Sequence, residues 1–260
     1  MWDPKTYLTY ADERTRPARD LLAAVAVEAP RTVVDLGCGT GTSTRLLAAR
    51  WPAADVLGSD SSPEMIETAQ DEGDAVISKN CRYEVADAAS WQGQVDVLFS
   101  NALLQWVPGH LELLPRWLSG VNPGGALAFQ VPANFDAPHH ALLREFAESP
   151  AWRDRLGHIS NRREHVHTPA EYADAIAAVG GRPDVWETTY LHRLTGEDPV
   201  VTWTMGTALR PVLEALKDDS QATEAFLAEY GAAVRAAYPV GKDGTTTFPF
   251  RRIFAVATPG

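Results

Sequence analysis

Segments with the apolar pattern of a strand alternate with segments with the apolar pattern of a helix through the first half of the chain. A short β-branched run at 32–36 is typical of a buried strand, and a second strand that ends in an acid is predicted at 55–60. Between them, a helical pattern places Leu46 and Leu47 on one apolar face. Further strands are predicted at 82–86, 95–100 and 126–131, and helices at 16–27, 42–50, from residue 63 onward and at 110–118. This alternation predicts a doubly wound α/β fold, with a parallel sheet and right-handed crossovers.

The regular alternation stops after residue 132. Later helices are expected at 137–148, 169–179, 199–216 and 221–238, and strands at 185–194 and 248–256. The segment 150–167 is charged and irregular, and 241–247 is expected to be a loop. We interpret about 132–180 and 196–247 as parts of one helical lid within a single domain. The lid would cover the carboxyl edge of the sheet, where ligands bind in open α/β folds.

The first strand ends in a glycine-rich turn that opens a helix, a combination typical of an anion or nucleotide site. A dinucleotide fingerprint would place a glycine at position 42, which is Thr42. The spacing of Asp35, Gly37, Gly39 and Gly41 instead resembles motif I, D-x-G-x-G-x-G, of class I S-adenosylmethionine (SAM) methyltransferases. A dehydrogenase that uses NAD is therefore disfavoured, and SAM is the expected cofactor, with S-adenosylhomocysteine as its product.

Polar residues follow the next three strands at the same edge of the sheet. Asp60 ends the second strand, where an acid can accept both ribose hydroxyls, and Ser61 lies beside it. Asp87 follows the third strand, where it can accept the adenine amino group or simply cap a turn, and the backbone of Ala88 is nearby. The stretch after the fourth strand would meet the methionine half of the cofactor and the substrate. Its predicted cofactor-binding residues are Asn101, Leu104, Gln105 and Trp106.

Composition narrows the class of protein. The chain has 260 residues, is 45% hydrophobic and carries a net charge of −11, which argues against a nucleic-acid surface. Residues 1–4 begin no apolar run, and no stretch approaches the roughly 18 apolar residues of a membrane helix. Cys38 and Cys81 have no metal-binding spacing. We expect a monomeric cytoplasmic enzyme without a metal, and an anionic substrate would need a local basic pocket.

Motifs along nearly the whole chain carry a more specific resemblance. The chain is similar to the trans-aconitate 2-methyltransferase family in the stretches 2–8, 13–17, 34–39, 58–63, 101–108, 188–192, 207–211 and 252–254. The resemblance implies the seven-stranded sheet of class I methyltransferases. It also implies SAM-dependent esterification of one carboxylate of trans-aconitate, or of a closely related small polycarboxylate. The arginine-rich segment 150–166 departs from the family pattern.

This chemistry requires little of the protein beyond positioning. A carboxylate with a pKa near 4 is already ionised at neutral pH, so no general base and no catalytic side chain are expected. Arginine holds a carboxylate through two parallel hydrogen bonds, which makes Arg210 and Arg252 the first candidates for substrate binding. Tyr190 and His192 are the next, as hydrogen-bond donors. The remaining candidates are Tyr10, Arg14, Trp203 and His140.

Two alternatives stay open from the sequence. One is a methyltransferase with the same machinery that acts on a different small acid. The other is a regulator that binds SAM without catalysis, which the intact stretch from Asn101 to Trp106 and the polar lid disfavour.

Overall fold

The computed structural model describes residues 11–75, 79–160 and 166–260. The chain divides into two compact units. Unit 1 comprises Met1–Glu13, Ala133–Glu164 and Thr189–Arg251, and unit 2 comprises Arg14–Pro132, His165–Thr188 and Arg252–Gly260.

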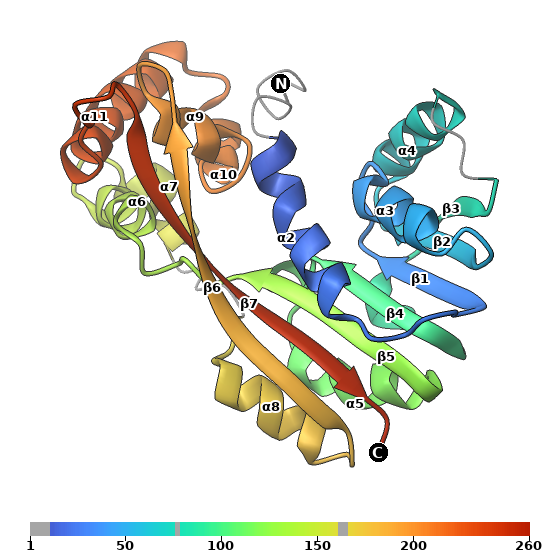
Figure 1. The fold of residues 1–260 in the computed structure, drawn as a ribbon. Coiled ribbons are helices and arrows are strands. Elements are labelled where there is room, and N and C mark those ends of the chain that lie inside the picture. The colour runs from blue at the N-terminus through green and yellow to red at the C-terminus, as the bar shows by residue number, and fades with distance from the viewer. Residues whose placement is uncertain (1–10, 76–78, 161–165) are drawn as a thin grey trace. The chain divides into compact units, whose positions relative to one another are not determined.

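Seven strands form one sheet, as predicted (Figure 1). Their order is β3-β2-β1-β4-β5-β7-β6. The strands are β1 Thr32–Leu36, β2 Asp55–Asp60, β3 Cys81–Val85, β4 Val95–Asn101, β5 Val121–Pro132, β6 Arg182–Leu194 and β7 Thr246–Thr258. The first five pair in parallel, and β7 pairs with β5 in the antiparallel direction. The carboxyl ends of β1, β2, β3, β4 and β5 therefore meet at one edge, which defines where a ligand can lie.

Helices cover both faces of the sheet in unit 2 (Figure 1). The helical elements here are α2 Ala11–Ala24, α3 Thr42–Arg50, α4 Pro63–Ala75, α5 His110–Ser119, α8 Pro169–Ala177 and the short 3₁₀ turns η1 Ala88–Ser90 and η2 Leu104–Trp106. Figure 1 shows α3 and α4 on one face and α5 and α8 on the other. Leu47 of α3 and Trp117 of α5 are fully buried, so each face has its own apolar layer. This is the doubly wound arrangement that the alternating pattern predicts.

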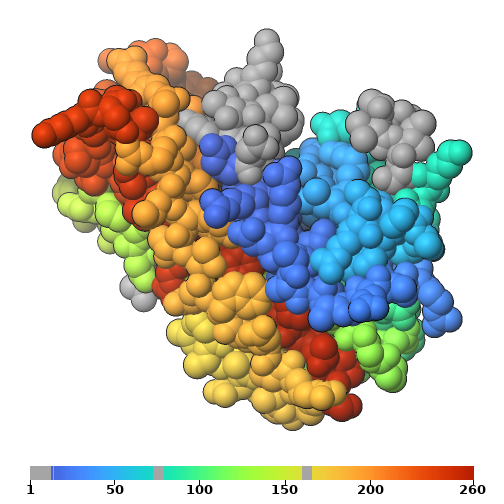
Figure 2. All heavy atoms as spheres, in the orientation of Figure 1, coloured from blue at the N-terminus to red at the C-terminus, as the bar shows by residue number. Residues whose placement is uncertain are grey.

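The lead-in helix α2 lies beside α3 on the surface of unit 2 (Figure 2). The Arg50 guanidinium donates hydrogen bonds to the carbonyl oxygens of Leu22 and Val25. The Leu22 and Val25 carbonyls lie at and just beyond the end of α2, so these bonds connect that end to Arg50 of α3. The helix begins and ends earlier than the predicted 16–27.

Unit 1 has a separate apolar core built on five helices. They are α6 Pro138–Glu148, α7 Arg153–Ser160, α9 Pro199–Met205, α10 Arg210–Leu216 and α11 Ser220–Ala237. Trp152, Trp203, Phe226, Tyr230 and Phe248 are buried together in this core. The Tyr230 hydroxyl donates to the carbonyl oxygen of His139 at 3.0 Å, so even the polar end of that ring is satisfied.

The structure corrects three predicted elements. The segment 150–167 is not irregular throughout, because Trp152, Leu156 and Ile159 are buried at helical spacing around α7. The predicted helix 199–216 is two helices, since α9 ends at Gly206 and α10 starts with a proline in its first turn. The predicted strand 126–131 begins earlier, because β5 starts at Val121 and includes the exposed residues Pro123 and Gly124.

The predicted lid segment 132–180 extends beyond unit 1. Helix α8 belongs to unit 2, where Tyr172 is fully buried and its ring lies 5.2 Å from that of Phe129 in β5. That packing places 166–180 with the sheet. The lid function of the remaining segments stays a prediction.

Candidate functional site

The glycine turn after β1 has a backbone that only glycine adopts readily. Gly37, Gly39 and Gly41 have φ angles of 69°, 54° and 79°. A Cβ atom at Gly37 would lie 2.7 Å from a Leu103 side-chain carbon, and one at Gly41 would lie 2.5 Å from the Tyr83 hydroxyl. A Cβ at Gly39 would meet no described atom within 4 Å. Gly37 and Gly41 thus permit close packing, while Gly39 leaves bare peptide open to a ligand.

Asp35 lies fully buried beneath this turn. Its Oδ2 atom accepts hydrogen bonds from the hydroxyls of Ser43 and Thr44, both at 2.7 Å. Its Oδ1 atom is buried without a hydrogen-bond partner within the described part of the chain. Burial raises the pKa of Asp35 from 3.8 to about 6, although the two hydroxyls lower it and the charge of Asp60 adds to the rise. An acid with one unsatisfied oxygen is suited to a cationic or hydrogen-bond-donating ligand.

Asp60 supports the same turn from the end of β2. Its Oδ2 accepts from the backbone N–H of Gly39 at 2.9 Å, and its Oδ1 accepts from that of Ser62 at 3.0 Å. The carboxylate therefore connects the first and second strand ends. Ser61 is exposed beside it. A carboxylate has about four acceptor positions, so these two bonds leave capacity for a ligand hydroxyl.

Asp87 caps the short turn after β3. Its Oδ1 accepts from the backbone N–H of Ala89 at 2.9 Å, and the side chain is exposed. Ala88 is buried at the first position of η1. The capping role that was one alternative for Asp87 is therefore present, and it leaves the second carboxylate oxygen available for an adenine amino group.

The chain leaves β4 through a strained turn. Ala102 has a φ of 57°, an uncommon conformation for a residue with a side chain, and its N–H donates to the carbonyl oxygen of Gln130 at 2.9 Å. The Gln105 amide in turn donates to the Ala102 carbonyl oxygen. Leu104 is fully buried, whereas 57% of Trp106 is exposed. Strain of this kind accumulates at ligand sites, which agrees with the predicted role of this stretch.

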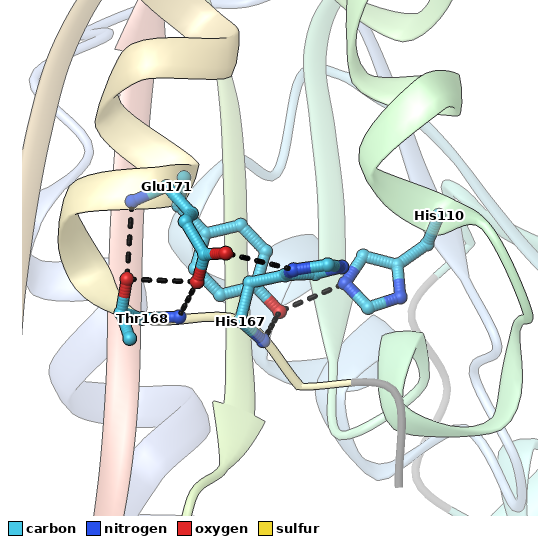
Figure 3. Close-up of polar contacts among 5 residues, drawn as sticks. His110, His167, Thr168 and Glu171 are labelled. Atoms are coloured by element: carbon cyan, nitrogen blue, oxygen red, sulfur yellow. Dashed lines mark hydrogen bonds and ion pairs between the residues drawn. The ribbon is translucent and has the colours of Figure 1, made fainter.

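Hydrogen bonds around the buried residues His110 and Tyr172 hold the far end of this turn. In the sequence, the one sign of this cluster is an isolated histidine at the start of a helix. His110 accepts at Nε2 from the Tyr172 hydroxyl at 2.8 Å, since its Nδ1 faces the Val107 carbonyl oxygen at 3.1 Å and must donate there. Figure 3 shows His110 beside His167, Thr168 and Glu171 at the start of α8. Thr168 and Glu171 form a capping box, which anchors that helix start. The turn is thus attached to α8.

Among the described residues, five of the predicted substrate-binding residues lie in unit 1, and Arg210 is one of them. Tyr190, His192 and Trp203 are buried, and the His192 ring stacks on that of Trp203 with centroids 5.0 Å apart. His140 is half-buried with its ring 4.5 Å from that of His139. Burial and the charge of Arg144 lower the pKa of His140 from 6.5 to about 4, so its ring is neutral at pH 7.

The two leading arginines differ in their surroundings. Arg252, in unit 2, is only 6% exposed, and its Nη1 donates to the Oε1 atom of Gln130 at 2.8 Å. Arg210, in unit 1, is exposed at the first position of α10. Tyr10 lies outside the described residues, and so does the side chain of Arg14, whose backbone belongs to α2. The predicted substrate residues are therefore distributed over both units.

The described residues contain no group of three or more histidines, cysteines or acids that could hold a metal ion. Within the same part of the chain, no helix is long and apolar enough to cross a membrane.

Comparisons with known proteins agree with this architecture. A family model described as a methyltransferase domain matches residues 7–180. Among solved structures, the YcgJ protein of Bacillus subtilis superposes with a TM-score of 0.60 at 12% identity, covering 94% of this chain and 99% of the other. A geranyl diphosphate methyltransferase solved with SAM gives a TM-score of 0.56 at 17% identity, covering 95% and 85%. These likenesses define the class as a Rossmann-like methyltransferase fold.

Curated relatives narrow the class to a family. A trans-aconitate 2-methyltransferase of Streptomyces avermitilis is 52% identical over 98% of this chain and 96% of the relative. Another from Rhodococcus jostii is 48% identical over 99% of both. The chain belongs to the trans-aconitate 2-methyltransferase family.

Proposed function

We propose that this protein transfers a methyl group from SAM to one carboxylate of trans-aconitate, giving the monomethyl ester. The observation that carries the proposal is the 52% identity with a relative of that name over nearly the full length of both chains. The open peptide at Gly39 and the unsatisfied oxygen of Asp35 support the cofactor assignment. The proposal includes the monomeric, cytoplasmic state expected from the sequence.

Each cofactor residue has a role that follows from its chemistry. Asp60 accepts the ribose hydroxyls, Asp87 and the backbone of Ala88 bind the adenine, and Asp35 complements the positive charge of the methionine half through the turn. Asn101, Leu104, Gln105 and Trp106 shape the reacting end. When bound, SAM supplies an electrophilic methyl group, which a carboxylate oxygen takes by in-line displacement as the carbon–sulfur bond breaks, leaving S-adenosylhomocysteine.

The protein's task is to hold the acid at the correct angle. Trans-aconitate carries three carboxylates, so two remain for binding while one reacts. Arg252 and Arg210 bind these two, and Tyr190, His192, Trp203, His140, Tyr10 and Arg14 complete the set. No residue has to remove a proton, because the nucleophile is ionised at neutral pH. Alignment alone can account for several kcal/mol of the barrier reduction.

Labelled SAM incubated with a panel of di- and tricarboxylates tests the proposal by mass spectrometry. We expect the label in a monomethyl ester of trans-aconitate, at a rate well above that for the other acids. A clear preference for another acid would overturn the substrate assignment, and label in none would overturn the enzymatic function.

A further inference from the structure

Three polar side chains form a row across the carboxyl end of the sheet in unit 2. Asn101 of β4 is in register with Gln130 of β5, and neighbours in register point to the same face. Gln130 is paired with Phe254 of β7, which places Arg252 diagonally across from Gln130 on that face. Asp35 of β1 is in register with Phe99, two residues before Asn101, so the face is the one on which Asp35 meets α3.

Gln130 lies at the centre of this row and is fully buried within an otherwise apolar run. Its Oε1 accepts from Arg252, while its backbone carbonyl accepts from the strained Ala102. Gln130 therefore accepts hydrogen bonds both from the Arg252 guanidinium and from the turn after β4. A long neutral amide at such a position is costly to bury unless its hydrogen bonds are made.

Two atoms of the row are still unsatisfied. The Nε2 donor of Gln130 and the Oδ1 acceptor of Asn101 are both buried, and neither has a hydrogen-bond partner among residues 11–75, 79–160 and 166–260. They belong to register neighbours, and one is a donor where the other is an acceptor. Unsatisfied buried groups of this kind typically indicate a site completed by a ligand.

We propose that Gln130 is a positioning residue for the substrate acid: through Oε1 it orients the Arg252 guanidinium toward a carboxylate, and through Nε2 it connects that arginine to Asn101 at the cofactor end. The inference rests on the proposed function and extends it to a residue that no sequence motif indicated. A free arginine side chain samples many rotamers, and fixing it before binding reduces the entropy lost when the acid binds. Gln130 needs no contact with substrate to act in this way.

A double-mutant cycle tests the proposal through binding. Trans-aconitate affinity is measured by calorimetry on the protein saturated with S-adenosylhomocysteine, for wild type, Gln130→Met, Arg252→Met and the double variant. We expect Gln130→Met to weaken acid binding about tenfold and the double variant to bind no more weakly than Arg252→Met alone. The affinity for S-adenosylhomocysteine should change less than about twofold, and KM should rise with kcat nearly unchanged.

Two further variants separate positioning from folding. Gln130→Glu keeps the acceptor and the shape, but its charge competes with the acid for Arg252, so acid affinity should fall in a folded protein. Ser100→Ala removes a buried hydroxyl one residue before Asn101, on the opposite face, and should leave acid binding unchanged.

The outcomes distinguish this inference from the function on which it rests. Wild-type acid affinity in Gln130→Met or Gln130→Glu, or fully additive losses in the double variant, would overturn the role of Gln130 while leaving the methyl transfer intact. A wild-type protein that neither binds nor methylates the acid would overturn the proposed function, and this inference with it.

Discussion

At the scale of single residues, ionisation of the buried Asp35 carboxyl lowers the stability of the fold, while its charge favours SAM binding. Its pKa is raised by burial from 3.8 to about 6, so the folded state holds this proton more tightly than the unfolded state. The stability that the folded state gains by holding the Asp35 proton is complete below about pH 4 and is lost as the pH rises through 6. The difference amounts to about 3 kcal/mol at neutral pH.

Asp35→Asn removes this pH dependence while keeping an oxygen for Ser43 and Thr44. The free energy of unfolding of the variant relative to wild type should therefore increase between pH 4 and 7, by up to about 3 kcal/mol. Denaturant titrations of the unliganded protein across that range measure the difference. SAM affinity should fall, because the carboxylate charge is gone. Parallel pH profiles of the two proteins would show that Asp35 is not the titrating group.

Asp60 gives a second prediction at the residue scale. Asp60→Ala removes an acceptor from two backbone N–H groups as well as from the ribose, so SAM affinity should fall by about 1.5–3 kcal/mol. Asp60→Asn keeps one oxygen and should lose less. Calorimetry with SAM measures both, and circular dichroism confirms folding. Unchanged affinity in folded Asp60→Ala would exclude Asp60 from the site.

At the scale of elements, the turn after β4 depends on its attachment to α8. Burial raises the pKa of the Tyr172 hydroxyl, which keeps it a hydrogen-bond donor to His110 throughout the physiological range. Tyr172→Phe removes the hydrogen bond that this buried hydroxyl donates to His110, and should destabilise the protein by about 1–3 kcal/mol. Hydrogen exchange should accelerate at 104–110.

Tyr230→Phe is the matched control for that variant. It removes another buried tyrosine hydroxyl, which donates to His139 in unit 1. It should lower stability without accelerating exchange at 104–110. Equal exchange at 104–110 in Tyr172→Phe and in wild type would contradict the attachment of the turn to α8.

The sequence predicted elements well where periodicity is strong and less well where other signals compete. β1 and β2 match their predicted bounds, because the β-branched run of β1 ends at a glycine turn and β2 ends at an acid before a helix start. Helix α7 was not predicted, because charged residues dominate the segment. Its buried residues Trp152, Leu156 and Ile159 nevertheless have helical spacing. Conversely, the apolar pattern from 199 to 216 gave no sign of the break after α9, whose C-cap is Gly206, before α10 begins at Arg210.

At the scale of the whole molecule, the residues predicted to bind the cofactor and those predicted to bind the substrate differ in how the fold distributes them. The glycine spacing and the acids at strand ends are local in sequence, and the fold gathers them at one edge of unit 2. The predicted substrate residues come from both units, so no local pattern could show which of them meet. The contact between Gln130 and Arg252 was unpredictable for a related reason, since the two residues are distant along the chain and only the sheet pairing brings them together.

The central claim is that this protein itself transfers the methyl group to trans-aconitate. Single-turnover methyl transfer tests it most directly: the protein is mixed with a stoichiometric amount of isotopically labelled SAM and excess trans-aconitate, and quenched samples are analysed by mass spectrometry. The account predicts about one equivalent of labelled monomethyl ester per chain, formed together with S-adenosylhomocysteine. Tight SAM binding without any ester would contradict it and would indicate a protein that binds the cofactor without catalysis.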